Sequence, residues 1–108
     1  MALRHAQYME VIDLTAPEPI GCTSISTSLF KAEQLQVLRL VLPKDHTLPE
    51  HHVIGEITIH CLSGDSTVKT PSAECRLTAG ELVVLAGNEP HAVHAHEAST
   101  LLVTIVRG

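Results

Sequence analysis

Apolar and polar side chains alternate with a period of two along most of the chain beyond residue 22. This is the period of a β-strand that buries one face. Stretches rich in Gly, Pro, Asn, Asp and Ser separate the alternating segments and are typical of turns. The expected strands are 23–30, 35–42, 56–62, 65–70, 73–78, 81–86, 91–97 and 100–106. Many short strands in one small chain predict an all-β sandwich or barrel.

The chain has 108 residues, which is enough for one domain with its own core. Two prolines in "APEPIG" (16–21) indicate an irregular segment, so we expect an N-terminal arm over 1–22 and a single barrel domain over 23–108. Strands 35–42 and 100–106 are apolar on both faces. One face can fill the barrel and the other needs cover. Because a second copy of the chain would provide that cover, we expect a homodimer.

The net charge of -5 and the lack of a Lys/Arg cluster argue against a nucleic-acid partner. No apolar run is long enough to span a membrane, and the N-terminus lacks the pattern of a signal peptide. The three cysteines show no CxxC spacing, which favours reduced thiols. We therefore expect a cytoplasmic protein with neither a membrane nor a nucleic-acid partner.

Alternation also predicts which side chains point into the barrel. In "EITIHCL" (56–62), Ile57 and Cys61 lie on the apolar face, which should point inward, whereas Glu56 lies on the opposite face. In "HAVHAHE" (91–97), His91 shares its face with Val93 and Ala95. The same reasoning places His94 and His96 on the outside.

Two stretches are similar to the motifs of a known family. The segment "GELVVLAGNEPH" (80–91) resembles the second cupin motif, with Gly80 and His91 at the matching ends. The proline of that motif is Ala86 here and its second glycine is Asn88, a residue that tolerates a left-handed turn. The segment "CLSGD" (61–65) resembles the hairpin that closes the first motif.

This resemblance covers residues 34 to 106 approximately. It implies a small single-domain cupin of the RmlC-like, cupin type-2 kind, whose fold is a double-stranded β-helix, or jelly-roll barrel. In metal-binding cupins the first motif supplies two histidines and a glutamate. Counting back from Gly64 places that glutamate position at Ile57 and not at Glu56, so the chain departs from the family here.

The stretch "PEHHVIGE" (49–56) nevertheless holds two histidines and two glutamates. Imidazole and carboxylate together suit Fe, Mn, Ni or Zn. The candidate ligands of one divalent transition metal are His51, His52, Glu56 and His91, with Glu50 as a substitute for the carboxylate. Glu56 would turn inward only through a β-bulge near Gly55. A metal-free barrel is the other interpretation, and both stay open.

The predicted ligand pocket contains His51, His91, Ile57 and Cys61. We expect a small cupin-fold protein whose His-lined pocket binds a small molecule. The alternative is a metal-dependent oxygenase or isomerase that acts on a small polar substrate, so enzymatic turnover stays undecided.

Overall fold

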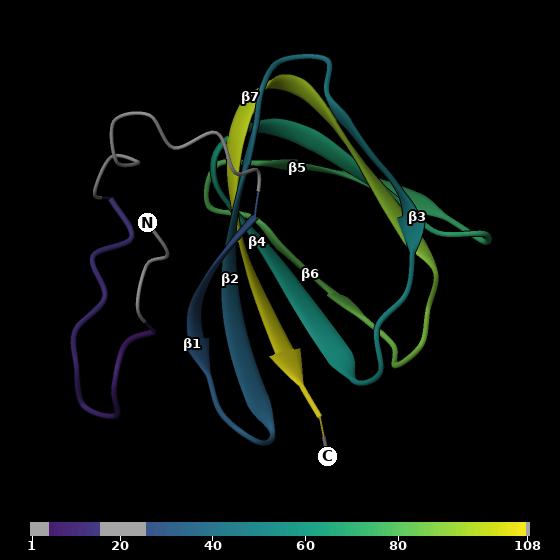
Figure 1. Ribbon diagram of the computed structural model, residues 1–108. Coiled ribbons are helices and arrows are strands. Elements are labelled where there is room, and N and C mark those ends of the chain that lie inside the picture. The colour runs from purple at the N-terminus through teal and green to yellow at the C-terminus, as the bar shows by residue number, and fades with distance from the viewer. Residues whose placement is uncertain (1–4, 16–25, 108) are drawn as a thin grey trace.

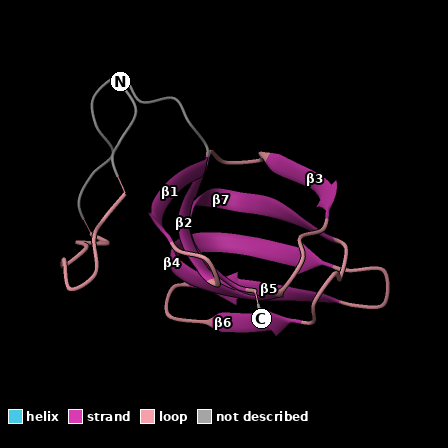
Figure 2. Cartoon of the chain, turned by 60° about the horizontal axis from the view of Figure 1, so that its bottom comes forward, coloured by secondary structure: helices cyan, strands magenta, loops and turns pink. Residues whose placement is uncertain are grey.

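The structure is a computed structural model that describes residues 5–15 and 26–107, and within these ranges every regular element is a strand. The described part of the chain thus has no helix that could cross a membrane. The strands wrap around a common interior (Figure 2), which confirms the predicted all-β fold. They are β1 (Ser26–Lys31), β2 (Leu35–Leu42), β3 (Thr47–His51), β4 (Glu56–Lys69), β5 (Glu74–Thr78), β6 (Leu82–Leu85) and β7 (His91–Val106).

The two longest strands, β4 and β7, pair with each other antiparallel from one end to the other. Figure 1 shows both strands curving together through the barrel. The register of β4 shifts at three places between Cys61 and Ser66, where the pair bends. β2 and β6 flank one half of the bent pair, whereas β3 and β5 flank the other half.

The bend therefore divides the sheet into two halves that face each other. One half has the strand order β1-β2-β7-β4-β6, and the other has the order β3-β7-β4-β5. The side chains between the halves form an aliphatic core. Its buried members are Leu42, Ile57, Ile59, Cys61, Val68, Leu77, Leu85, Val93, Ala95, Leu101, Val103 and Ile105. The inward faces predicted for 56–62 and 91–97 are confirmed by this burial.

Two predicted chain reversals are wrong, because the chain continues as strand through both. Segments 56–62 and 65–70 form the single strand β4, and 91–97 and 100–106 form the single strand β7. Gly64 has a φ of +96° and lies at the bulge in β4. The hydroxyl of Ser99 accepts a hydrogen bond from the Asp65 amide at 3.0 Å and donates one to the Glu97 carbonyl at 2.8 Å. These bonds join the two strands at the corner, so turn-forming residues here make a bend and not a reversal.

Strand β3 was not predicted, because its residues belong to the stretch "PKDHTLPEHH", which is typical of a loop. Among the described strands β3 pairs with β7 alone, at an edge of the sheet, and it changes register between Leu48 and His51. Pro49 lies at this irregularity. Because proline has no N–H to donate to a ladder, edge strands and bulges are the places where a sheet accepts it.

The described part of the N-terminal arm lies against β1. The Ala6 amide donates a hydrogen bond to the Leu29 carbonyl at 2.9 Å, and the rings of Tyr8 and Phe30 meet edge to face. The expected boundary between residues 22 and 23, with Cys22 and the start of strand 23–30, lies outside the described residues. The homodimer stays a prediction.

The corner at Gly64 should tolerate a side chain poorly. An added Cβ at Gly64 would lie 2.3 Å from the Ala98 carbonyl oxygen, whereas at Gly80, which has a φ of +90°, it would meet no atom within 4 Å. We predict that Gly80→Ala costs about 1–2 kcal/mol of unfolding free energy from backbone strain alone. Gly64→Ala should cost about 4 kcal/mol or more because it adds a steric clash. Urea unfolding measures both, and equal costs would contradict the close approach at the corner.

Candidate functional site

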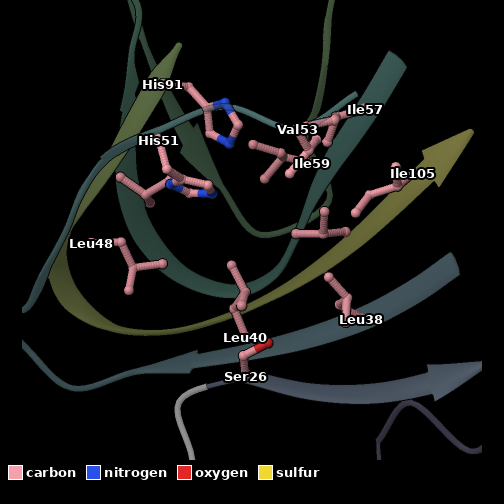
Figure 3. Close-up of a pocket in the computed structure, with 12 residues that line it drawn as sticks. Ser26, Leu38, Leu40, Leu48, His51, Val53, Ile57, Ile59, His91 and Ile105 are labelled. Carbon is pink, nitrogen blue, oxygen red and sulfur yellow. The ribbon is translucent and has the colours of Figure 1, made fainter. Parts of the chain in front are cut away.

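A cavity of about 270 Å³ lies between the two halves of the barrel. Aliphatic side chains form most of its lining, and the polar side chains are those of Ser26, His51 and His91 (Figure 3). The aliphatic residues of the lining are Leu38, Leu40, Leu48, Val53, Ile57, Ile59, Val93, Val103 and Ile105. The cavity is therefore an apolar chamber with two imidazole rings on its wall.

Strand pairing brings the two histidines together. His51 ends β3 and His91 begins β7, and the two residues are partners in the β3–β7 ladder. Their ring centroids lie 4.4 Å apart with an interplanar angle of 55°. The turn before His91 depends on Asn88, whose φ of +63° is the left-handed conformation that asparagine tolerates. This position corresponds to a glycine in the motif that the segment resembles.

The hydrogen bonds of the two histidines fix their tautomers. Nδ1 of His51 lies 3.2 Å from the Pro49 carbonyl oxygen, and Nδ1 of His91 lies 3.0 Å from the Glu89 carbonyl oxygen. A carbonyl oxygen only accepts, so each Nδ1 must carry the proton. In the neutral rings both Nε2 atoms therefore hold a lone pair. Besides the Ser26 hydroxyl, the polar side chains of the cavity therefore contribute two hydrogen-bond acceptors that are also potential metal ligands.

Burial keeps His91 neutral. Its side chain is almost fully enclosed, and the resulting desolvation lowers the pKa of His91 below its ordinary value of 6.5. The hydrogen bond to Glu89 favours the charged ring and opposes this shift, whereas the nearby charge of His51 adds to the lowering of the pKa. The pair is therefore poorly suited to carrying a positive charge on both rings at once.

The other predicted metal ligands point elsewhere. His52, Glu50 and Glu56 are exposed and do not line the cavity. Glu56 pairs in register with Val106, while the next residue, Ile57, is buried. The β-bulge near Gly55 that Glu56 would need in order to turn inward is not found, because β4 starts after this residue and keeps its register with β7 as far as Cys61. Within residues 5–15 and 26–107, no group of three or more His, Cys, Asp or Glu residues could hold a metal ion.

Two members of the predicted pocket have different positions. Ile57 lines the cavity, but Cys61 does not, because it is packed at the bend between the two halves. Its Sγ atom donates to the Ser63 carbonyl oxygen at 3.4 Å. Burial raises the pKa of the Cys61 thiol, and the negative charges of Asp65 and Glu81 raise it further. Cys61 is thus a protonated core residue.

The residues of the cavity that the sequence did not indicate are aliphatic, with the exception of Ser26. Leu38 and Leu40 are two residues apart on β2 and share a face, but both faces of this strand are apolar, so the pattern did not show which one points inward. Alternation gives the face of a strand but not the depth of a residue along the barrel. That depth decides whether an inward side chain lines the cavity, as Ile57 does, or lies at the bend, as Cys61 does.

The lowered pKa of His91 predicts a pH dependence of stability. Because the folded pKa lies below the unfolded one, the unfolded chain binds more protons in the interval between them. The contribution of neutral His91 to the unfolding free energy should be fully present above pH 6.5, the ordinary pKa of histidine. It should decrease as the pH falls from there toward the pKa of His91 in the folded protein. Urea unfolding should therefore show that acidification lowers the unfolding free energy of the wild type more than that of His91→Gln. A direct NMR titration of the His91 ring in the wild type is the second check, and a pKa at or above 6.5 would contradict it.

Solved structures share this architecture. A conserved protein of unknown function from Streptococcus pyogenes is 23% identical, with a TM-score of 0.78 over 100% of this chain and 96% of that chain. An RmlC-like cupin from Shewanella frigidimarina is 16% identical, with a TM-score of 0.75 over 98% and 96% of the two chains. An RmlC-like cupin from Desulfovibrio desulfuricans is 19% identical, with a TM-score of 0.70 over 87% and 97%. No protein-family model and no curated protein matches the sequence. The all-strand barrel and these structural neighbours together identify the chain as a cupin-fold protein, built as a jelly-roll barrel.

Proposed function

We propose that this cupin-fold protein binds a small, mainly apolar molecule in the barrel cavity and recognises its polar group through His51 and His91. The observation that carries the proposal is the pair of Nε2 lone pairs in a chamber whose lining is aliphatic apart from these two histidines and Ser26. Ligand sites typically combine an apolar lining with a few polar groups that fix the orientation of the ligand.

The size and lining of the cavity restrict the ligand. A volume of about 270 Å³ lies just below the range of about 300–1,000 Å³ that is usual for ligand pockets. A small metabolite fits such a space, whereas a dinucleotide does not. The wall offers little besides aliphatic side chains, so a ligand with many polar groups would lose hydrogen bonds to water without replacement.

The polar end of the ligand should be a hydrogen-bond donor. With both Nδ1 protons directed to backbone carbonyls, neutral His51 and His91 present only acceptors. A hydroxyl or amine group can donate to them, whereas an ether or a ketone cannot. The pocket should therefore distinguish an alcohol from its ether or hydrocarbon analogue.

Metal-dependent catalysis is the second candidate function. It is favoured by the two Nε2 atoms, because a metal-bound histidine commonly donates its other ring N–H to a carbonyl group, as both rings do here. The orientation of Glu56 and Glu50 toward solvent counts against it, because no carboxylate would complete the ligand set. An apolar lining also fits poorly with the small polar substrate of the oxygenase or isomerase alternative.

The binding proposal predicts thermal stabilisation of metal-free protein by small phenols or alcohols. A free ligand concentration of about 100 times the Kd should increase the unfolding free energy by about 2.7 kcal/mol. His51→Gln should weaken binding by roughly 2- to 10-fold, because one hydrogen bond contributes about 0.5–1.5 kcal/mol. His52→Gln is the matched control, since His52 is also exposed but does not line the cavity. Equal affinity for 4-methylphenol and its methyl ether, or equal effects of the two substitutions, would contradict the proposed role of the histidines.

The metal candidate makes a separate prediction. If His51 and His91 hold an ion, untagged protein should contain close to one equivalent of Fe, Mn, Ni or Zn, and His91→Gln should remove it. Plasma mass spectrometry measures this content. Our proposal of metal-free binding predicts well below one equivalent at this pair, and a full equivalent that depends on His91 would favour the catalytic alternative instead.

A further inference from the structure

The outer face of the barrel carries a second pair of histidines. A shallow hollow of about 280 Å³ lies on the half formed by β3, β7, β4 and β5. It is separate from the inner cavity, with which it shares only Val93. The residues around it are Thr47, Thr67, Lys69, Glu74, Ala92, Val93, His94 and His96.

His94 and His96 are two residues apart on β7, so their side chains leave the same face of the strand. Their ring centroids are 5.0 Å apart and the rings meet at 71°. The inward neighbours on this strand, Val93 and Ala95, are buried in the core. The backbone beneath the two rings is therefore fixed by the barrel, and both histidines are held at one location.

A threonine hydroxyl fixes each ring. Nδ1 of His94 lies 2.6 Å from Oγ1 of Thr47 on β3, and Nε2 of His96 lies 2.7 Å from Oγ1 of Thr67 on β4. When the hydroxyls accept these hydrogen bonds, Nε2 of His94 and Nδ1 of His96 each keep a lone pair. Metal-bound histidines use their second ring nitrogen in this way, to orient the ring and increase its basicity.

The separation of the rings suits a shared metal ion. An ion about 2.1 Å from an imidazole nitrogen lies about 3.2 Å from the centre of that ring, so two rings that share one ion at a roughly tetrahedral angle have centroids about 5 Å apart. The centroids of His94 and His96 are 5.0 Å apart. The pair therefore meets the distance requirement for a shared ion.

We propose that His94 and His96 form a binding site for a divalent transition-metal ion on the outer face of the barrel, with water in the remaining coordination positions. Imidazole nitrogens suit Zn²⁺, Ni²⁺ and Cu²⁺, of which Cu²⁺ binds most tightly. With two protein ligands the site is open and exchangeable, in contrast to a closed structural site with four ligands. This site is independent of the inner cavity and of the function proposed for it.

The charged groups around the pair are nearly balanced. Asp65 and Lys69 come from β4, and Glu74 and Arg76 come from β5. Arg76 forms an ion pair with Asp65, and this bond is the main cause of the lowered pKa of the Asp65 carboxyl, with a smaller contribution from the charge of His96. The selectivity of the site must therefore come from the two imidazole rings. Because both rings must be deprotonated to bind, acidification should release the ion.

Calorimetric titration of untagged protein with Zn²⁺, in a buffer that does not chelate metal, tests the proposal. We expect the wild type to bind Zn²⁺, and we expect its affinity to fall by at least about tenfold in His94→Gln and in His96→Gln, since each substitution removes one of the two ligands. Both residues lie on the outer face, so neither substitution disturbs the core. His60→Gln is the matched control, because His60 also faces outward but makes no ring contact with a second histidine among the described residues. An unchanged isotherm in the His94 and His96 variants would overturn the proposal.

The position of the ion can be measured independently. Cu²⁺ at a small fraction of one equivalent broadens the NMR signals of nearby nuclei, and the broadening should centre on residues 92–98 of β7 with Thr47 and Thr67. Broadening confined to His51 and His91 would place the ion at the inner pair and would contradict the outer site. A His51→Gln variant that still shows the outer pattern would support it.

Discussion

The pairing of β4 with β7 is the interaction on which the rest of the structure depends. Both strands bend at the same place, so one continuous ladder supplies the centre of both halves of the barrel. The bend changes which residues of β4 point inward. Before it the buried residues have odd numbers, as at Ile57 and Ile59, and after it they have even numbers, as at Ser66 and Val68. Only an irregular register between Cys61 and Ser66 permits this change. The glycine at position 64 and the hydroxyl of Ser99 make the corner possible.

The same ladder builds the candidate site. β3 docks on the first residues of β7, and this places His51 beside His91. Each ring is held by the carbonyl group two residues before it, which leaves two acceptors on the wall of an aliphatic chamber. The carboxylate that would convert such a pair into a common metal centre is turned to solvent at Glu56. These features together favour recognition of a small donor molecule over metal chemistry inside the barrel.

The sequence predicted the inward faces of 56–62 and 91–97, because a period of two leaves only one way to bury an aliphatic face. Ile57 and His91 were placed inward for this reason, and both are buried. The sequence did not predict β3, because Pro49 and its polar neighbours are typical of a loop. It also did not predict that β4 continues through Gly64, because the residue types that reverse a chain can also bend a strand. The tautomers of His51 and His91 depend on backbone carbonyls, whose positions no residue pattern specifies.

The measurement that most directly tests this account is the protonation of the two inner histidines. Two-dimensional NMR that correlates the ring nitrogens with the ring carbon-bound protons distinguishes a protonated nitrogen from one with a lone pair. At neutral pH, in metal-free protein, we predict a proton on Nδ1 and a lone pair on Nε2 in both His51 and His91. A proton on Nε2 of either ring would contradict it, because the cavity would then present a donor where we infer an acceptor.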